Sequence, residues 1–127
     1  MFDALSLKYD ANGLIPAIAQ DAASGEVLMM AWMNADAVAR TLETGSVTYW
    51  SRSRQAFWVK GESSGHLQTL AEMRVDCDRD CLLVLVRQEG PACHTNRRSC
   101  FYTAIRDGAE EVIMEPMAGQ GDAAPVA

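Results

Sequence analysis

The sequence contains no long apolar run, and its start lacks the marks of an export signal. No stretch approaches the ~20 consecutive apolar residues that a membrane-spanning helix needs, so we expect no membrane partner. Residues 1–8 have neither a basic start nor an apolar segment, and we therefore expect no signal peptide. A cytoplasmic protein is the expectation, in which four cysteines indicate metal ligands or a catalytic thiol rather than disulfides.

Positive charge is scarce. Lysine and arginine together number 11 against 17 aspartates and glutamates, which gives a net charge of −6. Because an acidic chain is a poor general binder of nucleic acid, no such partner is expected, and an anionic substrate would need a local basic cluster or bound cations. Two signatures are also missing: the G-x-x-x-x-G-K pattern of a P-loop, and the H-x-E with P-C-x-x-C pattern of zinc deaminases.

The 127 residues, of which 49% are hydrophobic, suit one domain with a core. We expect that domain over residues 1–116 and a disordered, glycine- and alanine-rich tail over 117–127. Apolar patterning and turn residues predict strands over 14–21, 26–33, 47–50, 67–77, 81–88 and 100–105, with a weak segment at 110–114. The first two strands should form a hairpin. The near-continuously apolar strand 81–88 should be central and buried on both faces.

One helix is predicted over residues 35–43. Asn34 is suited to its N-cap, and Gly45 supplies the stop. Val38 and Leu42 have the helical spacing that should lay them on the sheet. A cluster of large apolar residues precedes the helix and should belong to the core: Met29, Met30, Trp32 and Met33. The whole pattern predicts a mainly β fold of the α+β kind with one capping helix.

Two kinds of metal ligand stand side by side between residues 76 and 80. The carboxylates of Asp76, Asp78 and Asp80 suit Mg²⁺, and the thiolate of Cys77 suits Zn²⁺. If strand 67–77 keeps its alternation, Cys77 lies on one face and the carboxylates on the other, which predicts two separate metal sites. The alternatives are a solvated acidic turn and a small buried cysteine.

Two further thiols, Cys93 and Cys100, flank a polar loop, and His94 stands beside the first of them. Their spacing lacks the tight C-x₂-C of structural zinc sites, so the pair is either a metal site or two ordinary cysteines. The same loop carries Arg97 and Arg98, which are either additional phosphate ligands or solvated.

Residues 51–66 gather phosphate-binding groups in an otherwise acidic chain. Guanidinium groups and hydroxyls bind phosphate, and glycines let backbone N–H groups approach it. The candidates are Ser51, Arg52, Ser53, Arg54, Lys60, Ser63, Ser64 and His66. The alternative is a solvated hairpin loop.

Five motifs occur in a characteristic order: Gly25-Glu26-Val27-Leu28-Met29, Ser51-Arg52-Ser53-Arg54, Trp58-x-Lys60-Gly61-Glu62-Ser63-Ser64-Gly65-His66, Asp76-Cys77-Asp78-x-Asp80 and Cys93-His94-Thr95-x-x-x-Ser99-Cys100-Phe101. Together they resemble the phosphoribosyl-AMP cyclohydrolase family, over about residues 15–102. The resemblance implies hydrolytic opening of the adenine ring of 1-(5-phosphoribosyl)-AMP between N1 and C6, a step of histidine biosynthesis. It adds Trp58 to the substrate-binding candidates.

The resemblance also implies a homodimer of small β pseudo-barrels, each capped by a helix. One Zn²⁺ per subunit would be bound by Cys93, Cys100 and the partner's Cys77, and Mg²⁺ by Asp76, Asp78 and Asp80. Zinc would supply the hydroxide that attacks C6. His94 would be the general acid–base, or would only orient the substrate. His66 would belong to a phosphate-binding loop.

Three positions depart from the family pattern. Cys81 replaces a small residue and is either inert core or a spurious ligand. Asn96 replaces a glycine, and asparagine tolerates the left-handed backbone conformation better than most residues. Ser63 replaces a threonine and keeps the hydroxyl. A non-enzymatic zinc-binding module that grips a partner through the basic segment is the alternative function.

Overall fold

The computed structural model describes residues 2–117, which form mostly strands and one α-helix. In chain order the elements are η1 (Ala4–Ser6), β1 (Ile15–Asp21), β2 (Val27–Met33), α1 (Ala35–Thr44), β3 (Thr48–Ser51), β4 (Ala56–Val59), β5 (Gln68–Val75), β6 (Leu82–Gln88), β7 (Thr103–Arg106) and β8 (Ala109–Val112). The mainly β prediction is confirmed, whereas β4 was not predicted. Within residues 2–117, no helix has the length and apolar character that a bilayer crossing requires.

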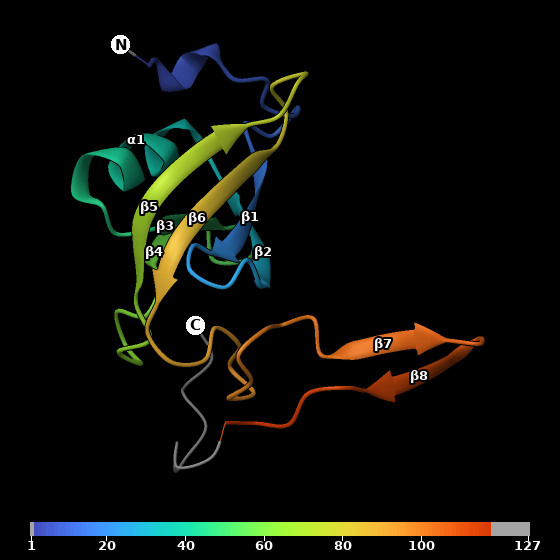
Figure 1. The fold of residues 1–127 in the computed structure, drawn as a ribbon. Helices are drawn as coiled ribbons and strands as arrows, with labels where there is room; N and C mark the ends of the chain where they lie inside the picture. Colours follow the sequence, from blue (N-terminus) through green and yellow to red (C-terminus); the bar gives the residue numbers. More distant parts are fainter. Residues whose placement is uncertain (1, 118–127) are drawn as a thin grey trace.

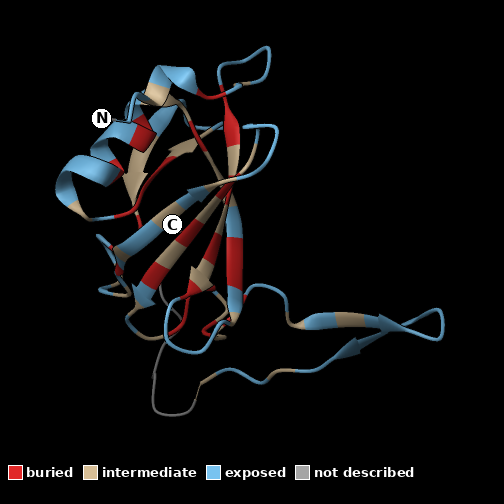
Figure 2. Ribbon diagram, turned by 45° about the horizontal axis from the view of Figure 1, so that its top comes forward, coloured by how far each residue is buried: buried red, intermediate tan, exposed pale blue. Residues whose placement is uncertain are grey.

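Four strands form the main sheet, in the order β2-β1-β6-β5 (Figure 1). β1 and β2 form the predicted antiparallel hairpin, β5 and β6 form a second one, and a parallel pairing of β1 with β6 joins the two hairpins. Every second residue of β1 is fully or almost fully buried, as are Leu82, Val84 and Val86 of β6 (Figure 2). β6 is central, as predicted, but only one of its faces is fully buried; Leu83 and Leu85 on the other are half-buried.

The helix α1 has the predicted ends. Asn34 Oδ1 accepts a hydrogen bond from the Ala37 N–H at 2.8 Å, and Gly45 adopts the left-handed conformation at φ 78° that ends the helix. The buried face consists of Ala37, Val38 and Thr41. The prediction that Leu42 packs on the sheet is wrong, because Leu42 is 42% exposed. Thr41 occupies the interior instead, where its hydroxyl accepts a hydrogen bond from the Thr48 N–H at 2.9 Å.

β5 does not keep one alternation along its length. Its register against β6 shifts between Leu70 and Glu72, so residues on opposite sides of this bulge reverse the face that they present. The strand also ends at Val75, two residues earlier than predicted. Asp76 and Cys77 therefore belong to the turn between β5 and β6, and strand alternation does not fix their relative directions.

β3 and β4 form a separate two-stranded sheet beside α1 and β2. A bridge between Ser46 and Thr69 ties this sheet to β5. Tyr49 of β3 is fully buried, and its hydroxyl donates to Gln68 Oε1 at 2.7 Å. The expected capping helix is present, but the sheets of residues 2–117 do not close into a barrel within one chain.

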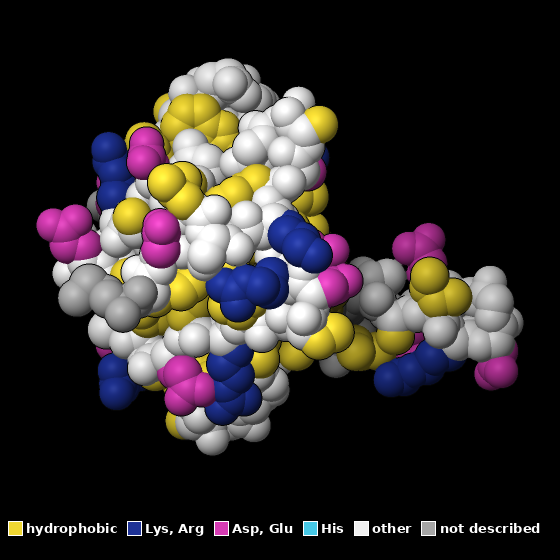
Figure 3. Space-filling model, turned by 90° about the horizontal axis from the view of Figure 1, so that it is seen from above, with side chains coloured by type: hydrophobic (Ala, Val, Ile, Leu, Met, Phe, Trp, Pro, Cys, Tyr) yellow, Lys and Arg dark blue, Asp and Glu magenta, His cyan; other side chains and the backbone are white. Residues whose placement is uncertain are grey.

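β7 and β8 form an arm that projects from the rest of the molecule (Figure 1). The last strand was predicted from residue 100, yet β7 begins at Thr103. The arm is exposed along its length, with Ile105 77% exposed, and hydrophobic atoms are visible on it and at its base (Figures 2 and 3). At the end of the described residues, Met117 N donates to the Asn96 carbonyl. Residues 118–127 of the predicted tail lie outside the described residues.

Candidate functional site

All three tryptophans of the chain line one cavity of about 650 Å³. β2 contributes Trp32, β3 contributes Trp50 and β4 contributes Trp58. The full lining is Met30, Ala31, Trp32, Trp50, Ser51, Arg52, Ser53, Arg54 and Trp58. This volume lies within the range of small-molecule sites, and the lining mixes large apolar surface with a few polar groups, as such sites do.

The turn between β3 and β4 places two arginines at this cavity. Ser51 Oγ accepts hydrogen bonds from the backbone N–H of Arg54 at 3.2 Å and from its Nε at 3.4 Å. The guanidinium group of Arg52 lies over the Trp32 ring, 4.8 Å from its centroid. Gln55 adopts φ 51° and donates to the Arg52 carbonyl, which closes the turn. The predicted residues Ser51, Arg52, Ser53, Arg54 and Trp58 are thus brought together.

Sequence reasoning missed Met30, Trp32 and Trp50 as cavity residues. Met29 and Met33 are buried, as predicted, but the core assignment of Met30 and Trp32 is wrong: Met30 is 44% exposed and Trp32 is half-buried at the cavity. The alternation of a strand would have indicated this, because residues 30 and 32 share the face opposite to that of 29 and 33.

The thiols of Cys93 and Cys100 are neighbours, close enough for each to shift the pKa of the other. Cys93 is buried, and its sulfur also accepts a hydrogen bond from Thr95 Oγ1 at 3.1 Å. Cys100 follows the loop, where its N–H donates to the Leu28 carbonyl of β2 at 2.7 Å. Ser99 Oγ donates to the Val27 carbonyl at the same distance. The loop of residues 92–100 is therefore anchored on β2.

The two thiols differ in acidity. Burial, together with the neighbouring Cys93, raises the pKa of the Cys100 thiol to about 12; although the residue as a whole is exposed, its sulfur is desolvated. Burial also acts to raise the pKa of Cys93, but the hydrogen bonds from Thr95, the contact with Cys100 and the Lys60 charge outweigh it and lower this pKa. Cys93 is therefore the readier thiolate of the pair.

Lys60 lies in the interior beside these thiols. It is 8% exposed, its Nζ donates to the Ala92 carbonyl at 2.6 Å, and its ammonium lies 5.7 Å from the centroid of the Trp58 ring. Burial lowers its pKa, against the opposing effect of the Cys100 and Cys93 thiols. Lys60 is not among the residues that line the cavity with Arg52 and Arg54.

The histidines occupy different surroundings. His94 is exposed and adjacent in sequence to Cys93. His66 is half-buried, and its backbone passes so close to Gly61 that a Cβ there would lie 2.4 Å from the His66 carbonyl carbon. Gly61 also has φ 84°, so only glycine fits this close approach. In the same loop Ser63 is exposed, and Ser64 Oγ accepts the His66 N–H at 3.2 Å.

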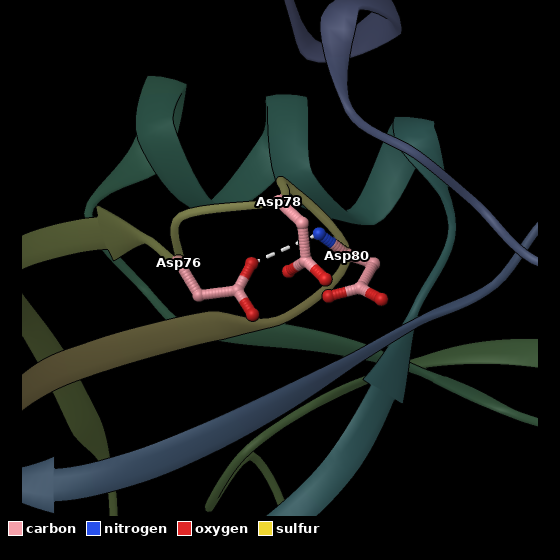
Figure 4. A group of neighbouring side chains, drawn as sticks. All are labelled: Asp76, Asp78 and Asp80. Atoms are coloured by element: carbon pink, nitrogen blue, oxygen red, sulfur yellow. Dashed lines mark hydrogen bonds between the residues drawn. The ribbon is translucent and has the colours of Figure 1, made fainter.

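The three aspartates form a second cluster, in the turn between β5 and β6. One oxygen from each of Asp76, Asp78 and Asp80 lies within 4.8 Å of the others, and all three residues are exposed (Figure 4). Asp76 Oδ1 accepts backbone N–H groups from Asp80 at 2.9 Å and Cys81 at 3.1 Å. Interaction with Asp78, then desolvation and Asp76, raises the pKa of Asp80. Such converging carboxylates suit a hard divalent cation.

The thiol pair and the acidic turn lie at opposite ends of the β5–β6 hairpin (Figure 1). At one end Val75 pairs with Leu82, next to the turn that carries Cys77; at the other Gln68 pairs with Gln88, shortly before the thiol loop. A strand rises about 3.3 Å per residue, so β6 separates its two ends by roughly 20 Å. One chain therefore brings Cys93 and Cys100 together but leaves Cys77 apart.

Arg98 and Arg97 are engaged within the chain. Arg98 pairs with Asp21 at 2.9 Å and with Glu26 at 3.2 Å, and it donates to the Gly90 carbonyl at 3.0 Å. Arg97 Nε donates to the Met114 carbonyl at 2.7 Å. The two side chains hold the thiol loop to the β1–β2 turn and to the segment that follows the arm.

Comparison with known proteins assigns the chain to a family. A family model described as Phosphoribosyl-AMP cyclohydrolase matches residues 29–102. The chain is 85% identical to a phosphoribosyl-AMP cyclohydrolase of Dinoroseobacter shibae over 116 residues, which cover 91% of this chain and 98% of the relative. Relatives of the same name from Paracoccus denitrificans and Ruegeria pomeroyi are 81% and 79% identical over 91% of this chain, covering 96% and 98% of their lengths. The chain belongs to the phosphoribosyl-AMP cyclohydrolase family.

The resemblance seen in the sequence motifs is thereby confirmed. The phosphoribosyl-AMP cyclohydrolase match contains the tryptophan cavity, the acidic turn and both thiols of the loop, and it ends at the base of the arm. Asn96 lies within the match, with φ 68°, so the left-handed conformation expected at this position is present. Its side-chain Oδ1 is buried and has no hydrogen-bond partner in the described residues.

Proposed function

We propose that this protein is a phosphoribosyl-AMP cyclohydrolase that opens the adenine ring of 1-(5-phosphoribosyl)-AMP between N1 and C6, as a step of histidine biosynthesis. The observation that carries the proposal is the cavity that combines three indole rings with Arg52 and Arg54. Stacking of a base on an aromatic ring contributes about 1–3 kcal/mol, and guanidinium groups bind phosphate. The two arginines also give the cavity local positive charge, in a chain whose net charge of −6 would as a whole repel an anionic nucleotide.

The thiol pair fits a zinc ion. Cys93 and Cys100 are already neighbours, both are thiols of the kind that zinc prefers, and Lys60 supplies positive charge beside them. A zinc ion bound there would supply a water of lowered pKa as the nucleophile. The converging oxygens of Asp76, Asp78 and Asp80 fit a magnesium ion, which would offset substrate phosphate charge.

Residues of the chain itself would transfer the proton and hold the substrate. His94 is exposed next to Cys93, where it can move a proton between the attacking oxygen and N1 of the adenine. The tryptophans orient the base, and the Ser51–Arg54 turn holds a phosphate. Ser63, Ser64 and His66 form a second polar loop, which approaches Gly90 near the thiol loop and suits the other phosphate.

The separation of the thiols supports a homodimer with a shared zinc site. Roughly 20 Å of strand separates Cys77 from Cys93 and Cys100 within one chain, as the strand rise requires. A two-fold axis would bring the partner's Cys77 to this pair and repeat the site twice. Dimer formation would also join the sheets, which are separate within one chain, into the small pseudo-barrels expected for the family.

The decisive experiment measures the ultraviolet spectrum of 1-(5-phosphoribosyl)-AMP during incubation with the protein. Ring opening changes the chromophore, whereas a binding module leaves it unchanged. We expect turnover to cease after chelation, to return with Zn²⁺, and to rise further with Mg²⁺. Arg52→Leu should raise KM, and Arg87→Leu, which alters an exposed arginine outside the cavity, should not. Binding of the nucleotide without any spectral change would refute the proposed reaction.

A further inference from the structure

Lys60 is a buried cation in a chain with only one other lysine, Lys8. Removing an ammonium group from water is unfavourable unless hydrogen bonds and negative charge replace its hydration. The Ala92 carbonyl supplies one hydrogen bond at 2.6 Å. Among the ion pairs formed by residues 2–117, none involves Lys60.

The groups around Lys60 identify what balances its charge. Ala92 immediately precedes Cys93, so the short hydrogen bond holds the backbone at the start of the thiol loop. The ammonium interacts electrostatically with both Cys93 and Cys100. The ring of Trp58, whose negative π face favours a cation, lies with its centroid 5.7 Å from the ammonium. Each of these contacts directs Lys60 toward the thiols and the wall of the tryptophan cavity.

A phosphate-binding role does not fit this position. A phosphate ligand must present its nitrogen to the substrate, as Arg52 and Arg54 do at the cavity. Lys60 is 8% exposed and does not line that cavity. Its hydrogen bond to Ala92 also uses one of the three donors of the ammonium on the protein itself.

We propose that Lys60 is a positioning residue and the counter-charge of the thiol site. Its ammonium fixes the Ala92 carbonyl, and thereby the Cys93 backbone, and it balances the thiolates of Cys93 and Cys100 when a metal ion is bound. A dication with three thiolates carries one net negative charge, which a single ammonium cancels. This inference rests on the proposed metal site.

The test titrates metal-free protein with Co²⁺, whose charge-transfer bands with thiolates report binding without any need for activity. Lys60→Met keeps the length of the side chain and removes its charge. Changes to groups that support metal ligands typically weaken metal binding 10- to 100-fold, and we expect about this loss for Lys60→Met. Lys60→Arg, which keeps the charge, should recover most of the affinity. Lys8→Met is the matched control at an exposed lysine and should bind like the unaltered protein.

Lys60→Gln separates the two parts of the role, because glutamine retains a hydrogen-bond donor without charge. It should bind Co²⁺ more weakly than Lys60→Arg. If circular dichroism shows that Lys60→Met is unfolded, Lys60→Gln replaces it as the uncharged variant. Equal Co²⁺ affinity of Lys60→Gln and the unaltered protein would overturn the counter-charge role. No thiolate band in the unaltered protein, or a band that persists in Cys93→Ala, would refute the metal site itself and this inference with it.

Discussion

The two clusters of candidate metal ligands at the ends of the β5–β6 hairpin are built in opposite ways. In the acidic turn, Asp76, Asp78 and Asp80 are close in sequence, exposed, and arranged by hydrogen bonds within the same turn. In the thiol loop, Cys93 is buried, and the loop is held by contacts to β2, to Lys60 and to the β1–β2 turn. Local chain geometry suffices for exposed oxygen ligands, whereas the thiol pair depends on the packed sheet.

This difference predicts unequal consequences of mutation at the two clusters. Disturbing the thiol loop should affect both metal and fold, because its anchors are also contacts of the core. Disturbing the acidic turn should affect the cation and leave the fold intact.

The largest effect is expected at the thiols. Cys93→Ala and Cys100→Ala should each abolish tight zinc binding and activity, because each removes one of only three proposed thiolate ligands. Cys81→Ala is the matched control and should retain both. Zinc content per chain, measured by elemental analysis, checks this, and zinc loss only in Cys81→Ala would overturn the ligand assignment.

A mixing experiment tests whether the site is shared between chains. Cys77→Ala and Cys93→Ala proteins should each be inactive, but in a mixed dimer one of the two sites contains both lesions and the other none. With random pairing about half of the dimers are mixed, so refolding the two together should restore roughly a quarter of the activity. Absence of rescue in a mixture shown by native mass spectrometry to contain mixed dimers would place all three thiols within one chain.

Arg98 tests the anchoring of the thiol loop. Arg98→Ala leaves Asp21, whose side chain is 8% exposed, without its cationic partner. We expect the free energy of unfolding to fall by about 2–3 kcal/mol. This is the lower end of the loss that follows the breaking of a buried ion pair, because Arg98 is partly exposed. Arg106→Ala breaks an exposed pair with Glu111 and should cost less than about 1 kcal/mol. Urea denaturation measures both, and equal losses would contradict the anchoring role.

The smallest effect on the fold is expected at the acidic turn. Asp78→Asn removes one charge from an exposed cluster and should change the free energy of unfolding by no more than about 0.5 kcal/mol. Zinc content should stay unchanged, while the dependence of activity on Mg²⁺ weakens. Normal turnover across a magnesium titration would show that the cluster is only a solvated acidic turn.

Features fixed by neighbouring residues were predictable from the sequence. The ends of α1 follow from Asn34 and Gly45, and the convergence of the three aspartates needs only a turn. Features fixed by contacts between distant residues were not predictable from the sequence. The bulge in β5, which reverses its alternation, arises from pairing with β6. The burial of Thr41 in place of Leu42 is likewise accompanied by a contact outside the helix, the hydrogen bond with Thr48.

The candidate site divides in the same way. The motif order was enough to identify the family, and the Ser51–Arg54 turn lies at a cavity, while its binding of substrate stays a prediction. The interior position of Lys60 was not predictable, because nothing local distinguishes a lysine that reaches solvent from one that reaches the Ala92 carbonyl. Strand alternation could have removed Trp32 from the core, but the meeting of Trp32 with Trp50 at one cavity depends on the packing of β2 against β3.

The parallel seam between β1 and β6 has a consequence for the order of folding. Each hairpin, β1–β2 and β5–β6, can form from neighbouring segments, but the seam pairs Ala17 with Leu82, far apart along the chain. Closing so long a loop costs entropy before any contact is gained, and such non-local pairing slows folding. Joining the two hairpins is therefore expected to limit the folding rate, so a substitution at Ala17 or Val84 should slow refolding more than one on the β7–β8 arm.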